Sequence, residues 1–365
     1  MGALINRRSW HRFRQRFNDL RLKPFLDYAA YQTLGEEGGL FRFIGGFEST
    51  DGHTLWIRSD KLTVPVAIAR AQTYILPILK GSDPSEFLGD DEVLEQIRWN
   101  RVSALTEGSR VFIGGRLRPL KNRMTFVSSR EDPLMVIFYD CPERFLPGYV
   151  VRSAQYQNEY WNHLTPYGLI LGAFSLLILA LSFLPRPAYR LTIIPILIAL
   201  FTPVYPMLPP GMLFTMLARR LWRQVRIFLS YRNLLRLPLV YFSPGEETAR
   251  LPNGEAYGFI RRDALSGAPA SFPPLIPVSL SREAARKGES WHLFGSLDPS
   301  PEGPAVPRQP RDPFAPQGAI PGNPNALARK FTIQAYLLEI SAWLVFLTGL
   351  GLNILFIGTI IYLFR

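Results

Sequence analysis

Three uncharged stretches constrain this chain more than any other feature of its sequence. They cover Leu164–Leu184, Leu191–Ala218 and Ile340–Phe364. Each is long enough to cross a bilayer, because a helix needs about 20 apolar residues to span roughly 30 Å of hydrocarbon. The sequence therefore predicts an α+β membrane protein, with transmembrane helices 1 and 2 in residues 164–218 and transmembrane helix 3 in residues 331–365.

The distribution of charge bears on the partners. The formal net charge is +12, and arginine is concentrated in Arg7–Arg21 and Arg219–Arg236, the second of which directly follows a predicted span. We therefore expect a bilayer with anionic headgroups, and not nucleic acid, as the partner of this charge. Cys141 is the only cysteine, which excludes an intrachain disulfide and a cysteine zinc site.

Residues 1–27 predict a basic amphipathic helix. Trp10, Phe13, Phe17 and Leu20 recur at helical spacing, and arginines occupy much of the remaining surface. Two interpretations stay open. Either Trp10, Phe13 and Phe17 lie on an anionic membrane surface, or the helix packs on the next domain.

Residues 28–150 predict a soluble, all-β domain. The expected strands are rich in β-branched and aromatic residues and are separated by turn formers. They are Phe41–Phe47, Thr54–Arg58, Val64–Ile75, Arg110–Arg116, Met124–Val127 and Leu134–Tyr139. Between the third and fourth strands, the acidic segment Ser85–Trp99 favours a helix.

A short internal repeat marks two of these strands. The tetrapeptide Phe-Ile-Gly-Gly occurs at residues 43–46 and again at residues 112–115. Paired glycines inside a strand mark a bulge or a sharp bend. Bent hairpins, five or six strands and a connecting helix resemble a small closed barrel of the OB type over residues 38–140. Such barrels host many functions, so this likeness of architecture implies no particular chemistry.

The second uncharged stretch is interrupted by five prolines, each of which removes a backbone donor that lipid cannot replace. We expect a kinked span up to Leu208, a break at Pro209–Gly211 and an amphipathic helix over Met212–Leu237. Residues 219–237 of that helix should lie in the membrane interface. The side chains expected at the membrane surface are Arg219, Arg220, Arg223 and Arg226. A broken or re-entrant span is the alternative.

Lysine and arginine near the span ends number nine on one side and three on the other. This asymmetry predicts a multi-pass protein of the cell membrane with its N-terminus inside and its C-terminus outside. Residues 238–330, on the inner side, are expected to be irregular and proline-rich. Proline falls at every third position from 301 to 316, and at ~3.1 Å per residue a polyproline II run of this length makes a semi-rigid spacer of roughly 50 Å.

Small and polar residues inside the spans are candidate sites. Gly168 and Gly172 form a GxxxG pattern that favours close helix packing. Asn353 lies near the middle of the third span, where an amide needs a hydrogen-bond partner, so we expect it to hold helices together. Glu339 lies toward the inner end of the same span and is the candidate intramembrane functional residue.

No nucleotide, metal or nucleophile motif is visible, and the four histidines are scattered. We therefore predict no cofactor and no metal. The first hypothesis is a non-enzymatic, membrane-anchored scaffold whose cytoplasmic barrel recruits a protein partner. The alternative is a transporter component or lipid-modifying membrane enzyme that uses the proline-broken second span together with Glu339 and Asn353.

Overall fold

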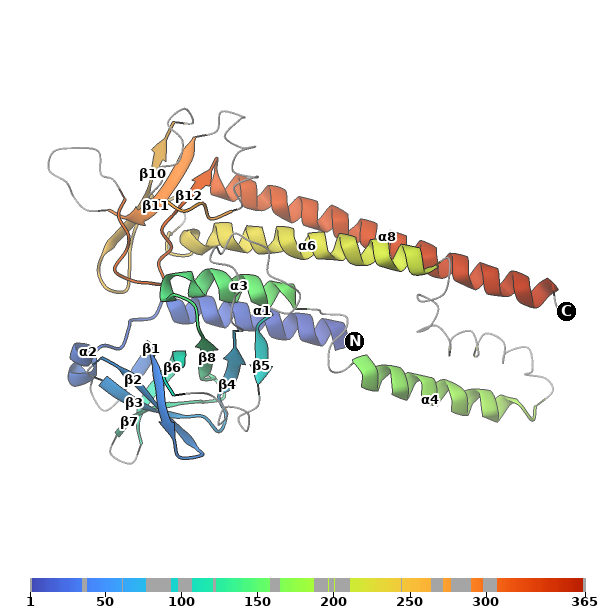
Figure 1. The fold of residues 1–365 in the computed structure, drawn as a ribbon, viewed down its shortest axis with the longest axis horizontal. Coiled ribbons are helices and arrows are strands. Elements are labelled where there is room, and N and C mark those ends of the chain that lie inside the picture. The colour runs from blue at the N-terminus through green and yellow to red at the C-terminus, as the bar shows by residue number, and fades with distance from the viewer. Residues whose placement is uncertain are drawn as a thin grey trace. The chain divides into compact units, whose positions relative to one another are not determined.

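A computed structural model of the chain shows two compact units, each built from separate stretches of sequence (Figure 1). Unit 1 comprises Met1–Trp10, Asn158–Leu229 and Lys330–Arg365, and unit 2 comprises His11–Gln157 and Ser230–Arg329. The residues that the structure describes are 2–34, 38–60, 62–76, 93–97, 107–120, 123–157, 165–186, 196, 200, 211–243, 245–263, 272–276, 290–297 and 307–363. Both predicted water-facing segments contribute to unit 2.

Unit 2 contains the predicted barrel. Five strands follow one another around a closed ring, in the order β1 (Gly39–Thr50), β2 (Thr54–Ser59), β3 (Leu62–Ala67), β7 (Arg123–Val127) and β6 (Arg110–Leu120). Neighbouring strands are antiparallel except β3 and β7, and the pairing of β6 with β1 closes the ring. The prediction of a small closed β-barrel is therefore confirmed.

The barrel interior is filled by apolar side chains from all five strands. They alternate along each strand with side chains that face outward, because successive residues of a strand point to opposite sides of the sheet. Fully buried members of this core include Phe43, Leu55, Val64, Ile113 and Phe126. The strands themselves were predicted from their β-branched and aromatic residues and from the turn formers between them.

The two Phe-Ile-Gly-Gly segments lie opposite each other in the barrel wall. β1 pairs with β6 so that Phe43 faces Ile113, and both side chains enter the core. Glycine is needed at the point where β1 leaves β6 and begins to pair with β2. A Cβ atom on Gly45 would lie 2.4 Å from the carbonyl oxygen of Arg58. The first copy of the repeat therefore lies just before an irregularity in β1, whose register with β2 shifts between Phe47 and Ser49.

Three further strands extend the sheet from β6 and correct two predictions. They are β8 (Met135–Tyr139), β4 (Gln72–Ile75) and β5 (Glu95–Ile97). The predicted strand Val64–Ile75 is divided into β3 and β4, because the chain turns between them with the Ala71 N–H donating to the Ile68 carbonyl at 2.9 Å. The end of the predicted helix Ser85–Trp99 is strand β5; residues 85–92 and 98–99 lie outside the described residues.

Helix α1 (Gly2–Arg21) presents its aromatic stripe to protein. The Phe13 ring packs on Tyr74 with centroids 4.5 Å apart, and Phe17 is fully buried. Trp10 is 9% exposed. The membrane-surface interpretation of these three aromatic residues is therefore wrong, because their side chains are already covered, and the packed-helix alternative describes α1.

The chain that follows the barrel contains two helical elements, and residues 158–164 lie outside the described residues. The 3-10 turn Glu143–Phe145 leads into α3 (Leu146–Tyr156), in which every residue except Gly148 is buried. A short helix, α2 (Tyr28–Thr33), precedes β1 and is capped by Asp27, whose carboxylate accepts from the Ala30 N–H at 2.7 Å.

Residues 238–330 were expected to be irregular, and the structure corrects this. Four antiparallel strands form a second sheet, in the order β12 (Gly318–Pro321), β11 (Trp291–Ser296), β10 (Ala256–Arg262) and β9 (Thr248–Arg250). In the second half of the proline run the chain turns, with the Ala315 N–H donating to the Asp312 carbonyl at 3.1 Å. Phe314 is fully buried. Residues 307–316 are therefore not an extended spacer, and residues 301–306 lie outside the described residues.

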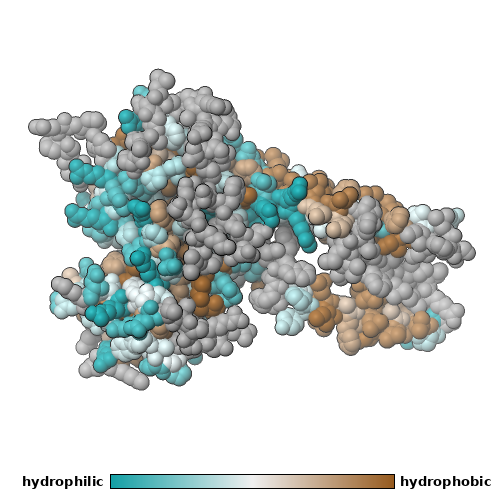
Figure 2. Space-filling view, viewed as in Figure 1, coloured by the Kyte–Doolittle hydropathy of each residue, from teal (hydrophilic) through white to brown (hydrophobic). Residues whose placement is uncertain are grey.

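Unit 1 contains apolar helices. Two helices in the described part of the chain are long and apolar enough to cross a membrane, at Thr165–Phe183 (α4) and Pro324–Thr359, within α8 (Pro324–Leu363). In the most apolar 18 residues of each helix, the buried share is 6% for α4 and 17% for α8. The core helix of a soluble protein is, by contrast, mostly buried. Figure 2 shows the apolar surface of α4 in brown along its length. These helices suggest association with a membrane. In the predicted second span, residues 191–210 lie outside the described residues except for 196 and 200.

The predicted helix after that span is present but differs in its surroundings. It forms α6 (Gly211–Leu239), which begins at the expected break after Pro210. Its last third belongs to unit 2, where Leu234, Leu235 and Leu237 are buried. The interfacial placement of residues 219–237 is therefore wrong for the end of the helix, because its leucine face is covered by protein.

Candidate functional site

The contact between α6 and α8 brings the polar residue of the third span to a helix terminus. The Gly211 N–H donates to Asn353 Oδ1 at 3.1 Å, and Asn353 is 1% exposed. Gly211 is the first residue of α6, so its N–H has no acceptor within the helix. Among apolar side chains an unpaired N–H is costly. Asn353 therefore acts as a cap supplied by a second helix.

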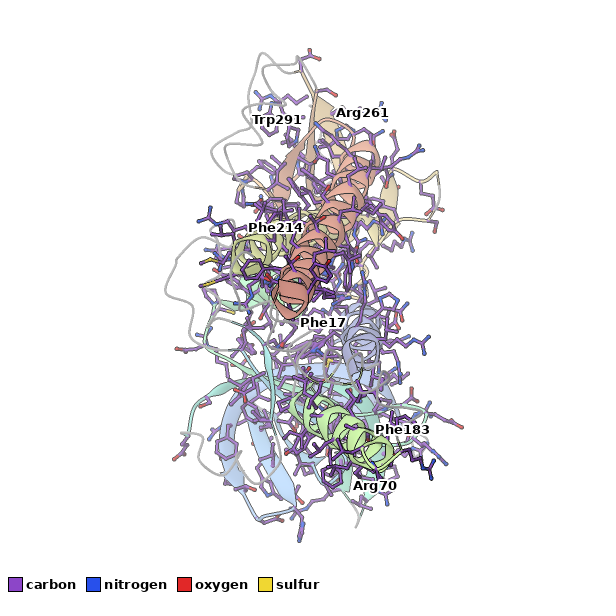
Figure 3. All side chains as sticks on the ribbon, turned by 90° about the vertical axis from the view of Figure 1, so that its right-hand side faces the viewer. Phe17, Arg70, Phe183, Phe214, Arg261 and Trp291 are labelled. Atoms are coloured by element: carbon purple, nitrogen blue, oxygen red, sulfur yellow. The ribbon has the colours of Figure 1, made fainter. Side chains whose placement is uncertain are left out.

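Glycines let the two helices approach closely at this point. A Cβ atom on Gly349 would lie 2.4 Å from the Phe214 Cβ, and one on Gly211 would lie 2.1 Å from the Asn353 amide nitrogen. Figure 3 labels Phe214 on α6. A Cβ on Gly351, by contrast, would meet no described atom within 4 Å. The glycine of α8 that allows close packing on α6 is therefore Gly349, which precedes Asn353 in the sequence.

Aromatic pairs continue the same contact along both helices. The ring centroids of Trp222 and Trp343 are 6.1 Å apart, and those of Phe228 and Phe331 are 5.8 Å apart. Residues later in α6 contact residues earlier in α8, so the two helices are antiparallel. Tryptophan is common where a membrane helix crosses the headgroup level, and the Trp222–Trp343 pair is a candidate for that level.

Glu339 is paired with a cation. Arg7 Nη1 donates to Glu339 Oε1 at 3.3 Å, and the side chains are 45% and 18% exposed, respectively. Sequence analysis assigned Glu339 as a lone candidate and missed this partner on α1. The ion pair gives the carboxylate a structural role; an intramembrane function for Glu339 stays a prediction.

The other predicted membrane residues are placed as follows. Arg219, Arg220 and Arg223 are exposed on the first half of α6, and Arg226 is half-buried. At Gly168 and Gly172, on α4, a Cβ would meet no described atom within 4 Å. The described part of the chain therefore supplies no helix against the GxxxG face.

Unit 2 contains a buried ion pair that sequence analysis did not predict. Arg42 on β1 and Asp312, in the loop before β12, form a two-pronged contact in which Arg42 Nη1 donates to Asp312 Oδ1 at 3.0 Å and Nη2 contacts Oδ2. Their side chains are 2% and 3% exposed. Arg42 Nε also donates to the Lys23 carbonyl at 2.7 Å. The pair joins the barrel to the segment that leads into the second sheet.

Phe314 completes this contact. Its ring lies 5.1 Å from the Arg42 guanidinium, and its N–H donates to Asp312 Oδ1 at 2.9 Å. Two tyrosines hold the same loop, because the Tyr241 hydroxyl donates to the Phe314 carbonyl at 3.1 Å and the Tyr257 hydroxyl donates to the Pro316 carbonyl at 2.7 Å. The loop is thus fixed by both charge and hydrogen bonds.

A second buried arginine lies close by. Arg21, at the end of α1, donates to the Leu237 carbonyl in the last turn of α6 and lies 5.2 Å from the Tyr241 ring. A cation at a helix C-terminus is favourable. Burial nevertheless lowers the pKa of Arg21, as does the charge of Arg42, while Asp312 opposes the shift. The arrangement ties helix ends together and contains no exposed reactive group.

No cluster of three or more His, Cys, Asp or Glu side chains in the described part of the chain could hold a metal ion. Burial raises the pKa of the Cys141 thiol to about 12, so it is not a thiolate at neutral pH. Comparison with models of known families, with curated proteins and with solved structures gives no match.

Proposed function

We propose that this chain is a multi-pass membrane-anchored scaffold that presents the folded unit 2 to a protein partner. The observation that carries the proposal is the Arg42–Asp312 pair. It joins residues on either side of the first two predicted spans, so the two segments form one folded unit rather than a barrel and a flexible spacer. A folded unit on apolar helices is suited to recruitment at a membrane.

The finer architecture supports this proposal. The ring order β1-β2-β3-β7-β6, with one parallel pair and a bent first strand, supports a barrel of the OB type. From Trp343 to Leu363, α8 has a length of about 30 Å at 1.5 Å per residue, which matches the hydrocarbon core. We propose that Leu191–Ala218 provides a further, broken span. We also propose that the N-terminus lies on the inner side of the cell membrane and the C-terminus on the outer side.

Anionic headgroups are the second proposed partner. Arg219, Arg220 and Arg223 lie exposed on α6, near the Trp222–Trp343 contact proposed for the headgroup level. Basic residues near a membrane surface each gain about 1 kcal/mol from anionic lipid. We therefore propose lipid contacts on α6, which would leave unit 2 for the protein partner.

The test is purification of the full-length chain from native membranes in mild detergent, followed by quantitative mass spectrometry. We expect a partner protein in stoichiometric amount. The isolated barrel is unsuitable for this test, because removal of α1 would expose the Phe17 and Tyr74 contacts that cover its sheet. Recovery of the chain alone, or with lipid only, would contradict the scaffold proposal.

A second candidate rests on the start of α6. Its first N–H is capped by Asn353 directly after a proline break, and broken helices line substrate sites in many transporters. If this candidate is correct, Glu339→Gln and Asn353→Ala should each abolish complementation of a deletion strain. Both variants should still insert in the membrane. Full complementation by both variants would exclude this candidate.

A further inference from the structure

The outer wall of the barrel carries basic and aromatic side chains that none of the contacts above uses. On β2, Leu55 and Ile57 face the core, so Trp56 and Arg58 face outward. On the other side of β3, Arg123 of β7 and Arg118 of β6 are exposed on the same wall. We refer to Trp56, Arg58, Arg118 and Arg123 as the arginine face.

The members of the arginine face are held close together. The Arg123 guanidinium lies 5.5 Å from the centroid of the Trp56 ring, which joins β7 to β2 across β3. The Arg58 side chain is 65% exposed and makes only a 3.8 Å contact with Glu48. Contacts between exposed charges of this kind are worth at most about 1 kcal/mol, so Arg58 can exchange Glu48 for another acid.

Positive charge is in excess around this face. Next to it, Arg16 and Arg116 both contact Asp132, at 3.4 Å and 3.0 Å, so one carboxylate serves two guanidinium groups. Across residues 39–140 acidic and basic residues are equal in number. The excess is therefore a local property of the arginine face and not of the whole barrel.

We propose that the arginine face binds an acidic peptide segment of the partner protein. Guanidinium groups bind carboxylates through two parallel hydrogen bonds, and arginine and tryptophan are the residues that most often dominate binding energy at interfaces. A single strand of nucleic acid would instead need successive aromatic platforms and a basic groove, whereas Trp56 is the one aromatic member of the face among the described residues. The inference rests on the proposed scaffold function and names the chemistry of its partner.

The direct test uses the full-length chain in detergent and fluorescence anisotropy with a labelled glutamate-rich peptide and its glutamine analogue. We expect the glutamate peptide to bind at least about tenfold more tightly than the analogue, and R58E/R123E to remove that difference. Arg70→Glu is the matched control, because Arg70 is exposed on the same barrel, at the turn between β3 and β4 (Figure 3). Trp56→Ala should weaken binding without any change in charge.

Three outcomes would overturn the inference: equal binding by R58E/R123E and the wild type, equal loss in R70E, or binding of oligothymidine or anionic vesicles through the same arginines in place of the peptide. Thermal unfolding of each variant shows whether a loss of binding reflects misfolding.

Failure of the inference is distinguishable from failure of the proposed function. If the wild type and R58E/R123E both co-purify with a partner, the scaffold stands and the arginine face does not bind it. If the wild type co-purifies with none, the scaffold itself fails.

Discussion

Removal of Asp312 should destabilise unit 2 strongly. Asp312→Ala leaves the Arg42 guanidinium charged where its side chain is only 2% exposed. Loss of one partner from a buried ion pair costs about 3–5 kcal/mol, because the remaining charge is uncompensated. The Phe314 N–H also loses its acceptor, which adds about 1 kcal/mol. This is a large share of the ~5–15 kcal/mol by which domains are stable.

The assay is thermal unfolding of the full-length chain in detergent, with differential scanning fluorimetry as the readout. For a unit of this size, a total loss of about 4–6 kcal/mol lowers the Tm by roughly 8 to 24 °C. Glu48→Ala is the matched control, because it breaks an exposed ion pair with an N–O distance of 3.8 Å. Its effect should stay below about 1 kcal/mol.

A second variant separates the charge effect from a packing effect. R42M/D312L replaces both charges by apolar side chains, so no uncompensated charge remains, and it should recover most of the stability lost in Asp312→Ala. If Asp312→Ala lowers the Tm no more than Glu48→Ala does, the loop is not docked on β1 and the argument for one folded unit fails.

Three further variants test other parts of the fold. Gly349→Ala should loosen the α6–α8 contact by about 1–3 kcal/mol, because the new methyl group would lie 2.4 Å from a side-chain carbon of α6, whereas Gly351→Ala should have no effect; detergent melting curves measure both, and equal effects would contradict the packing. Phe17→Ala should lower the free energy of unfolding by about 3–5 kcal/mol, because the ring is fully buried. Leu4→Ala, at a residue that is 62% exposed, should have little effect in the same unfolding assay. A small effect of Phe17→Ala would favour a lipid-bound helix. Burial lowers the pKa of His292, with help from a nearby arginine, so the unfolded state takes up the proton first and stability should fall as pH drops below about 6.5; His292→Gln should flatten this part of a Tm-against-pH profile, and an unchanged profile would assign the acid sensitivity to other groups.

Local pattern was sufficient to predict most of the barrel. Segments rich in β-branched and aromatic residues, separated by turn formers, became strands, and the glycines of the first repeat lie where a Cβ at Gly45 would obstruct the approach of β2. The aromatic stripe of α1 shows the limit of this reasoning. An amphipathic helix has the same pattern whether its apolar face meets lipid or a sheet, so Phe13 and Phe17 gave no basis for the choice.

Long-range pairs were beyond the reach of the sequence. Arg42 is the one charged residue in the predicted strand Phe41–Phe47, which indicates a buried partner but does not identify Asp312. The same holds for Glu339 and Arg7. The proline spacing misled for a related reason, because polyproline II is a local preference that the docking of Phe314 overrides.

The distance in sequence between Arg42 and Asp312 has a consequence for biosynthesis. The two residues are 270 positions apart, and at about 5–20 residues per second a ribosome needs roughly 14 to 54 s to make the intervening chain. During this interval the first half of the unit is made without Asp312 to neutralise Arg42 and without Phe314 to cover the Phe17 and Phe112 rings. Chaperone binding, or pausing of translation, would therefore matter most in that window, and a defect in membrane insertion would leave unit 2 permanently incomplete.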